Sequence, residues 1–187
     1  MDKKQRILLT MLELSAKNGL NATPISKVAK EANVAVGTIY HYYDTKEDIV
    51  KELYSIIVQD LAKMLVLNRD ISKPYKEQYH QLWLNFYNYF IANPSAFFFM
   101  DNVAIPPVID NEEVDKNVVH YRGLKEFMMQ GINEKHLKNV ELKLLMQMGF
   151  GNLIAISKIR LREELVMDEQ QINDAFEMSW DCIRYIE

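Results

Sequence analysis

The sequence predicts an all-α protein of about nine helices, with a three-helix N-terminal head and a larger helical-bundle body. Apolar residues recur at three- and four-residue spacing along most of the chain, and no stretch shows the strict alternation of a half-buried strand. Glycine and proline are scarce, at six and five in 187 residues, which favours helices over a turn-rich sheet fold. We place the head at residues 1–46 and the body at residues 47–187.

The head is expected to hold three short helices. Residues 3–18 carry apolar side chains at helical spacing and end at a glycine. Thr23 is expected to cap the second helix, with Pro24 in its first turn, where a missing N–H has no cost. Asn33 follows that helix directly, and asparagine tolerates the left-handed backbone of a helix end. A third helix is expected over residues 35–42.

The body is expected to be helical from its first residues. Thr45 should cap a fourth helix that ends near Asn68, and Asp48 stands three positions later in capping-box spacing. The most loop-like segment is 104–113, which contains two adjacent prolines. Further helices are expected near residues 74–92, 95–103, 113–131, 139–164 and 168–186.

The composition argues against several classes of protein. Cys182 is the only cysteine, so a disulfide framework within one chain is impossible and a reducing cytoplasm is expected. No apolar run approaches the roughly 18 residues that suggest a membrane span, and the charged N-terminus shows no cleavage site of a signal peptide. No phosphate-binding loop or nucleophile elbow is present, and we expect neither an enzyme nor a cofactor. The four histidines lack metal-ligand spacing, so no metal is expected; they are His41, His80, His120 and His136.

The charges are unevenly distributed along the chain. The formal net charge is −4, yet residues 1–50 hold seven basic and six acidic side chains, while the remainder holds fifteen and twenty. A head that is close to neutral on an acidic body indicates that any DNA contact belongs to the head.

The third helix carries an unusual concentration of bulky side chains with polar tips. A capped helix, a tight turn and a second helix form the layout of a helix-turn-helix DNA reader. Ile39 and Tyr43 are four residues apart and are expected to point inward, which leaves Tyr40, His41 and Tyr42 to project outward. Their hydroxyl and imidazole groups suit phosphate oxygens or base edges in a major groove. The alternative is that these aromatics merely pack an ordinary three-helix cluster.

Residues 7–50, ILLTMLELSAKNGLNATPISKVAKEANVAVGTIYHYYDTKEDIV, resemble the N-terminal DNA-binding domain of the tetracycline-repressor (TetR) family without a gap. The resemblance rests on the glycine after the first helix, the threonine before the second, the pair Val28-Ala29, and the run GTIYHYY followed by TKE. It does not extend recognisably into the body.

The resemblance implies a homodimeric transcriptional regulator, usually a repressor, that binds a palindromic double-stranded DNA operator. It also implies a body that forms the dimer through its last two long helices and holds a small-molecule effector. Ile39 and Tyr43 match core positions. The positions that match DNA contacts are Thr23, Ala35, Val36, Gly37, Thr38, Tyr40, His41, Tyr42 and Lys46.

Two positions depart from the family pattern. Ala35 stands where a phosphate-binding serine is common, and Val36 stands where many relatives carry Lys, Arg or Gln. Valine can pack on a thymine methyl group but removes a charge. An alternative therefore stays open: a helical ligand-sensing or interaction module with weak or no DNA binding. The sequence does not separate a repressor from an activator.

The body is rich in aromatic residues and methionine, which suit a large apolar pocket for a hydrophobic or aromatic effector. Polar groups for such a pocket are offered by Tyr87, His120, Tyr121 and Asn152. The bland alternative is that these residues only fill the core. The expected pocket residues are Trp83, Phe86, Tyr87, Phe90, Phe98, Met100, Tyr121, Met128 and Phe150.

Small side chains in residues 139–164 permit close approach of helices and suggest a dimer surface shared with the last helix. The same glycines are equally compatible with a ligand or a bend. The expected interface residues are Gly149, Ala155, Phe176 and Trp180.

Overall fold

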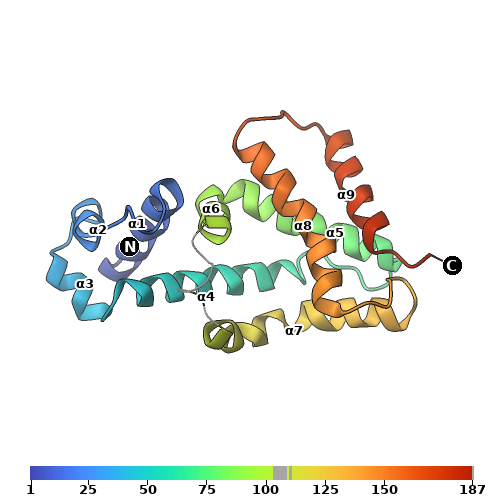
Figure 1. The fold of residues 1–187 in the computed structure, drawn as a ribbon, viewed down its shortest axis with the longest axis horizontal. Helices are drawn as coiled ribbons and strands as arrows, with labels where there is room; N and C mark the ends of the chain where they lie inside the picture. The colour runs from blue at the N-terminus through green and yellow to red at the C-terminus, as the bar shows by residue number, and fades with distance from the viewer. Residues whose placement is uncertain (103–108, 110, 187) are drawn as a thin grey trace. The chain divides into compact units, whose positions relative to one another are not determined.

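The computed structural model describes residues 1–102, 109 and 111–186. Nine α-helices make up the regular structure of this described part, as the sequence predicts (Figure 1). Most of the predicted loop at 104–113 lies outside the described residues, and its last three residues begin a helix. None of the helices in the described ranges combines the length and the apolar character that a membrane span requires.

The chain divides into two compact units, one of residues 1–59 and 93–119 and the other of residues 60–92 and 120–187. Two long helices, α4 and α7, begin in the first unit and end in the second. The first unit contains α1 (Lys3–Asn18), α2 (Ile25–Glu31), α3 (Val36–Tyr42), the beginnings of α4 (Lys46–Met64) and α7 (Asn111–Asn133), and α6 (Pro94–Asn102). The second contains α5 (Tyr75–Ala92), the ends of α4 and α7, α8 (Leu142–Leu161) and α9 (Glu169–Ile183). The predicted division into a DNA-binding head of residues 1–46 and a regulatory body of residues 47–187 is a division by function. The compact units do not test it, and it stays a prediction.

Local sequence rules predict several helix ends correctly. The Thr45 N–H donates to Asp48 Oδ2 at 2.8 Å and the Asp48 N–H donates to Thr45 Oγ1 at 3.2 Å, which is the predicted capping box. The hydrogen bond from the Thr45 hydroxyl lowers the pKa of the Asp48 carboxyl. Asn33 has the expected left-handed backbone, with φ of 52°.

The predicted cap of the second helix is wrong. Pro24 occupies the N-cap position of α2, and no side chain caps this helix. Thr23 is fully buried, and its hydroxyl donates to the Gly19 carbonyl oxygen at 2.9 Å. The hydroxyl therefore closes the turn between α1 and α2 instead of capping α2, because burial directs it inward.

In the first unit, α1 packs against α2, α3 and α6 and buries Ile7, Leu8 and Met11 completely or nearly so. Ile39 of α3 and Tyr43, which follows it, are the inward residues that the sequence predicts. Burial raises the pKa of the Tyr43 hydroxyl, and the nearby Glu52 carboxylate raises it further.

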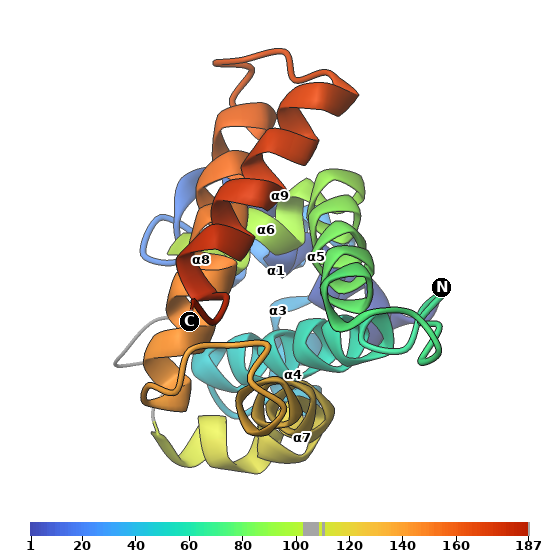
Figure 2. The ribbon, with the colours of Figure 1, turned by 90° about the vertical axis from the view of Figure 1, so that its right-hand side faces the viewer.

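In the second unit, α8 and α9 lie side by side and run antiparallel (Figures 1 and 2), and α5 packs against both. The Tyr79 hydroxyl of α5 donates to the Gly149 carbonyl oxygen at 2.8 Å. The Ser179 hydroxyl of α9 donates to the same oxygen. One backbone carbonyl of α8 thus joins three helices in the core.

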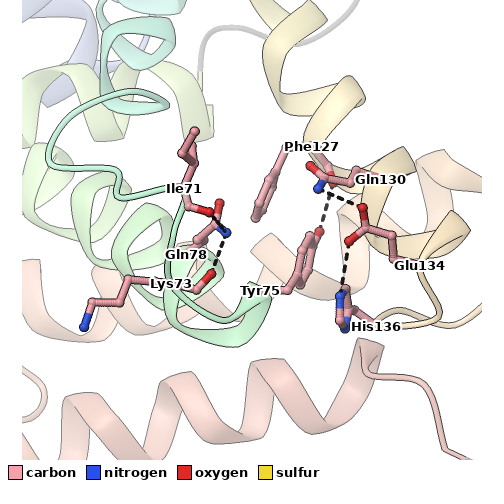
Figure 3. A network of polar contacts seen from close by, with 8 residues as sticks. All are labelled: Ile71, Lys73, Tyr75, Gln78, Phe127, Gln130, Glu134 and His136. Carbon is pink, nitrogen blue, oxygen red and sulfur yellow. Dashed lines mark hydrogen bonds and ion pairs between the residues drawn. The ribbon is translucent and has the colours of Figure 1, made fainter.

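Tyr75, the first residue of α5, joins this helix to α7 through a stack of aromatic rings (Figure 3). Its ring lies between those of Phe127, at 4.6 Å, and His136, at 4.9 Å, with centroid distances and small interplanar angles typical of stacking. Its hydroxyl donates to the Phe127 carbonyl oxygen at 3.0 Å. The Arg69 guanidinium lies over the outer face of Phe127, 4.6 Å from its centroid.

We expect Gly131→Ala to destabilise the protein by about 1–3 kcal/mol, because overpacking exceeds the gain in helix propensity. The added methyl would lie 2.5 Å from Tyr75 Cζ and 2.7 Å from Leu137 Cδ1. The Tyr75 ring cannot move aside readily, since it is stacked on both faces and hydrogen-bonded. Chemical denaturation of the purified variant measures the loss.

Gly37→Ala is the matched control, because this glycine also lies inside a helix but a methyl there meets no atom within 4 Å. It should leave the free energy of unfolding unchanged or raise it by up to about 1 kcal/mol. Equal effects of the two variants would contradict the packing argument.

Candidate functional site

The surface of α3 and the residue before it form one exposed face, which we call the α3 face. Ile39 is 1% exposed, whereas Tyr40 is 53% and Tyr42 is 42% exposed. Thr38 is half-buried, so its hydroxyl lies at the edge of this face. The exposed members are Ala35, Val36, Gly37, Tyr40, His41 and Tyr42.

This arrangement follows from the shortness of α3. A helix of seven residues has one inward stripe, here Ile39, and the chain then turns extended at Tyr43, which is also buried. The three residues between these anchors therefore project from the unit. The rings of His41 and Tyr42 stand edge to face with centroids 5.3 Å apart, so each restricts the other.

The backbone at Gly37 is open to an approaching group. A side chain added there would meet no atom within 4 Å, and the residue is exposed in the first turn of α3. A phosphate or a base edge can therefore come close to the main chain at this point.

Lys46 has a structural partner that the sequence does not reveal. Its ammonium group donates to the Leu20 carbonyl oxygen, which connects the start of α4 to the segment between α1 and α2. The ammonium has three N–H donors, so this contact leaves others for an anion. Thr23 differs, because it is fully buried and its hydroxyl is committed to Gly19. The geometry therefore gives Thr23 no surface on which to contact DNA directly.

The second unit holds an apolar cavity of about 220 Å³ that is partly open to the surface and is lined by residues of α4, α5, α7 and α8 and by Leu65. Its walls are almost entirely aliphatic and aromatic, and its polar side chains are an imidazole, a phenol and an amide. The lining residues are Leu61, Ala62, Leu65, Phe86, Phe90, His120, Tyr121, Leu124, Met146, Gln147, Phe150, Gly151, Leu153 and Ile154.

Four of the nine predicted pocket residues line this cavity: Phe86, Phe90, Tyr121 and Phe150. Trp83, Tyr87 and Met128 do not; they are core residues of the same unit, at most 4% exposed. Trp83 and Tyr87 stack on each other, with ring centroids 5.7 Å apart, which satisfies their faces without a ligand. Phe98 and Met100 lie on α6 in the first unit and are not part of the cavity.

The sequence did not reveal the contribution of the end of α4, with Leu61 and Ala62, and of Leu65 just after it. Their spacing continues the apolar face of that helix, so periodicity shows that they turn inward. It does not distinguish a cavity wall from a filled core, because both require the same residue types.

A second hollow, a groove of about 350 Å³, lies between α8 and α9. We call it the α8/α9 groove; it is lined by Gln147, Met148, Gly151, Asn152, Ile156, Ala175, Met178, Ser179 and Cys182. Met148 is 50% and Met178 is 73% exposed, so apolar surface faces outward here. Gln147 and Gly151 line the cavity as well, which makes this ridge of α8 common to both hollows.

Three of the four predicted interface residues are buried within the chain itself. Phe176 and Trp180 are at most 9% exposed, and Gly149 is enclosed by Tyr79 and Ile183. The small residue at 149 brings α8 close to α5 and α9 of the same chain. Ala155 is exposed, and its place in a dimer interface stays a prediction.

Within the part of the chain that the structure describes, no three His, Cys, Asp or Glu side chains are grouped so as to hold a metal ion.

Comparison with known protein families gives two matches. Residues 7–53 match the family described as bacterial regulatory proteins, tetR family. Residues 74–184 match the tetracyclin repressor-like C-terminal domain. Together they cover the helix-turn-helix and α5, α7, α8 and α9, which line the cavity and the groove, but not the end of α4.

Individual relatives agree with these matches. An uncharacterised helix-turn-helix transcriptional regulator of Haemophilus influenzae is 35% identical over 94 residues, which is 50% of each chain. The alignment therefore spans about half the length of that relative. A TetR family transcriptional regulator from Vibrio parahaemolyticus has a TM-score of 0.83 at 25% identity, covering 99% of this chain and 100% of that one. FadR of Bacillus subtilis, solved in complex with stearoyl-CoA, has a TM-score of 0.77 at 20% identity, covering 96% and 99%, which shows a shared fold.

We expect Thr23→Val to lower the free energy of unfolding by about 1–2 kcal/mol, because it leaves the Gly19 carbonyl without its hydroxyl donor. Thr23→Ser, which keeps the hydroxyl, should lose only the smaller contribution of one buried methyl group. Urea denaturation of both variants tests this role. A Thr23→Val protein as stable as the parent would contradict it.

Proposed function

Because the chain belongs to the TetR family of transcriptional regulators, we propose that it is a homodimeric repressor that leaves its DNA operator when a small apolar molecule enters the body. The observation that carries this proposal is the α3 face, where six exposed residues surround two buried anchors. We place its action in the cytoplasm, where a regulator meets DNA.

The α3 face has the chemistry of a major-groove reader. Tyr40, His41 and Tyr42 offer hydroxyl and imidazole groups that hydrogen-bond phosphates or base edges. Val36 offers an apolar contact for a thymine methyl, and Gly37 lets the backbone approach closely. Lys46 can contribute charge while it holds the start of α4. Thr23 would act only indirectly, by fixing the turn that precedes α2.

We expect Tyr42→Ala to weaken operator binding by a factor of about 5–150, which corresponds to one lost contact of roughly 1–3 kcal/mol. The operator is first obtained by capturing fragmented genomic DNA of the source on the purified protein and sequencing what is retained. Affinity is then measured over a range of salt concentrations, since phosphate contacts give a negative slope of log affinity against log salt.

Tyr185→Ala is the matched control, because Tyr185 is 40% exposed but lies after α9 in the second unit. It should bind the operator like the parent protein. Equal affinity of Tyr42→Ala and the parent would remove Tyr42 from the DNA interface. A folded dimer that retains no DNA sequence would favour a ligand-sensing or interaction module instead.

The α8/α9 groove is the surface that we assign to the second copy. It presents exposed Met148 and Met178 beside Gly151 and Ala155, which lack bulk and allow another helix to approach. A single helix of two turns has a small footprint, whereas two copies read half-sites about one helical turn apart. Dimerisation thus supplies the affinity that α3 alone lacks.

We expect Met178→Lys to shift the protein from dimer to monomer, because a charge at 73% exposed Met178 would have to be desolvated at the interface. Light scattering after size exclusion should report the 22.0 kDa of a single chain. Val66→Lys is the control, since Val66 is 72% exposed but belongs to the segment after α4. Dimeric Met178→Lys would move the interface elsewhere.

The effector is assigned to the apolar cavity. FadR of Bacillus subtilis, which shares the fold, was solved with stearoyl-CoA, so this fold can hold a molecule with an apolar chain. Helix α4 begins beside α3 with Lys46 and ends at the cavity with Leu61 and Ala62. A ligand that displaces its end therefore acts on the DNA-reading half, and a coupling of about 1–3 kcal/mol is enough for regulation.

A further inference from the structure

We propose that the cavity selects an uncharged, mainly apolar molecule of roughly 8–12 non-hydrogen atoms, and that it excludes both ions and coenzyme A thioesters. The inference rests on the proposed function, because it specifies the chemistry of the effector.

The first argument is that the described residues of the wall include none that is permanently charged. None of the 14 lining residues is Asp, Glu, Lys or Arg. An ion that leaves water for such a wall loses its hydration and gains no partner of opposite charge, which is strongly unfavourable. The wall therefore disfavours a carboxylate, a phosphate or an ammonium group inside the cavity.

The second argument is the small number of polar groups and their position. His120 and Tyr121 are adjacent on α7, and Gln147 comes from α8. An imidazole, a phenol and an amide can each donate or accept a hydrogen bond with a neutral group. They match a molecule with one hydroxyl, carbonyl or amide on an apolar frame.

The third argument is size. A cavity of about 150 Å³ in an apolar protein core holds benzene, and pockets for drug-sized ligands begin at about 300 Å³. At about 220 Å³ this cavity falls between the two. A volume of this size corresponds to a single substituted aromatic ring or to an alkyl chain of roughly eight carbons.

The fourth argument is the charge of the surrounding body. Residues 51–187 contain 15 basic and 20 acidic side chains, so their field opposes the approach of anions. The lining residues carry no permanent charge that would compensate a carboxylate or a coenzyme A phosphate. Cations are attracted at long range but find no carboxylate in the wall.

The test compares four molecules with the same eight-carbon chain by isothermal titration calorimetry on the full-length protein at pH 7.5. They are octan-1-ol, octanoate, octylammonium and octanoyl-coenzyme A. We expect octan-1-ol to bind at least tenfold more tightly than either ion, and octanoyl-coenzyme A to show no saturable binding. The proposal is overturned if an ion or the thioester binds as tightly as the alcohol, or if the alcohol does not bind saturably.

A pair of variants assigns the binding to this cavity. Ala62→Phe places a ring in the cavity wall on α4 and should weaken octan-1-ol binding at least tenfold. Ala92→Phe adds the same ring at an exposed position outside the lining, at the end of α5, and should leave binding unchanged. Circular dichroism checks folding, and Ala62→Leu replaces Ala62→Phe if the larger ring prevents it. Parent-like binding by the folded Ala62 variant overturns the proposal.

DNA capture with the same preparation separates this inference from the proposed function. If the protein retains one DNA sequence but does not bind octan-1-ol selectively, the inference fails alone. If it binds octan-1-ol selectively but retains no DNA sequence, the proposed function fails and the selectivity of the cavity is upheld.

Discussion

Two tyrosine hydroxyls of α5 donate hydrogen bonds to backbone carbonyls of α7 and α8. These bonds set the distances between the helices on which the second unit depends. Tyr75 donates to the Phe127 carbonyl and Tyr79 to the Gly149 carbonyl. In each case a glycine, Gly131 or Gly149, leaves the room that the hydroxyl occupies. A buried hydrogen bond is costly to break because the freed partner stays away from water. The distances from α5 to both neighbours are therefore fixed, and the cavity forms where the helices cannot close further.

The first unit differs from the second because it exposes bulky side chains of α3, namely Tyr40, His41 and Tyr42, instead of burying them. Ile39 and Tyr43 alone hold α3 to the core, and the ion pair of Lys4 with Glu52, at 2.8 Å, connects α1 to α4 beside Tyr43. Helix α3 is so short that its remaining side chains, apart from half-buried Thr38, stay exposed. Polar tips make such exposure tolerable in water and useful against DNA.

The sequence predicted local features correctly where one residue type caps a helix or adopts an unusual backbone conformation. The Thr45 capping box and the left-handed Asn33 are such cases. Thr23 was mispredicted as the cap of α2 because its side chain is buried in the folded unit. There its hydroxyl donates to the Gly19 carbonyl oxygen, and local sequence rules do not show this burial. The cavity was predicted only in part, because aromatic residues at helical spacing look alike whether a neighbour fills the space beside them, as at Trp83, or not, as at Phe86.

The glycines of α7 and α8 show why small residues alone could not locate an interface. A glycine inside a helix costs about 1 kcal/mol relative to alanine. At positions 131 and 149 that cost is offset by close packing against tyrosines of the same chain. Gly151 has no such compensation, since a side chain there would meet nothing within 4 Å. It lines both the cavity and the α8/α9 groove. Among the described residues, the glycine therefore leaves open space in the two hollows and does not permit close packing in the core.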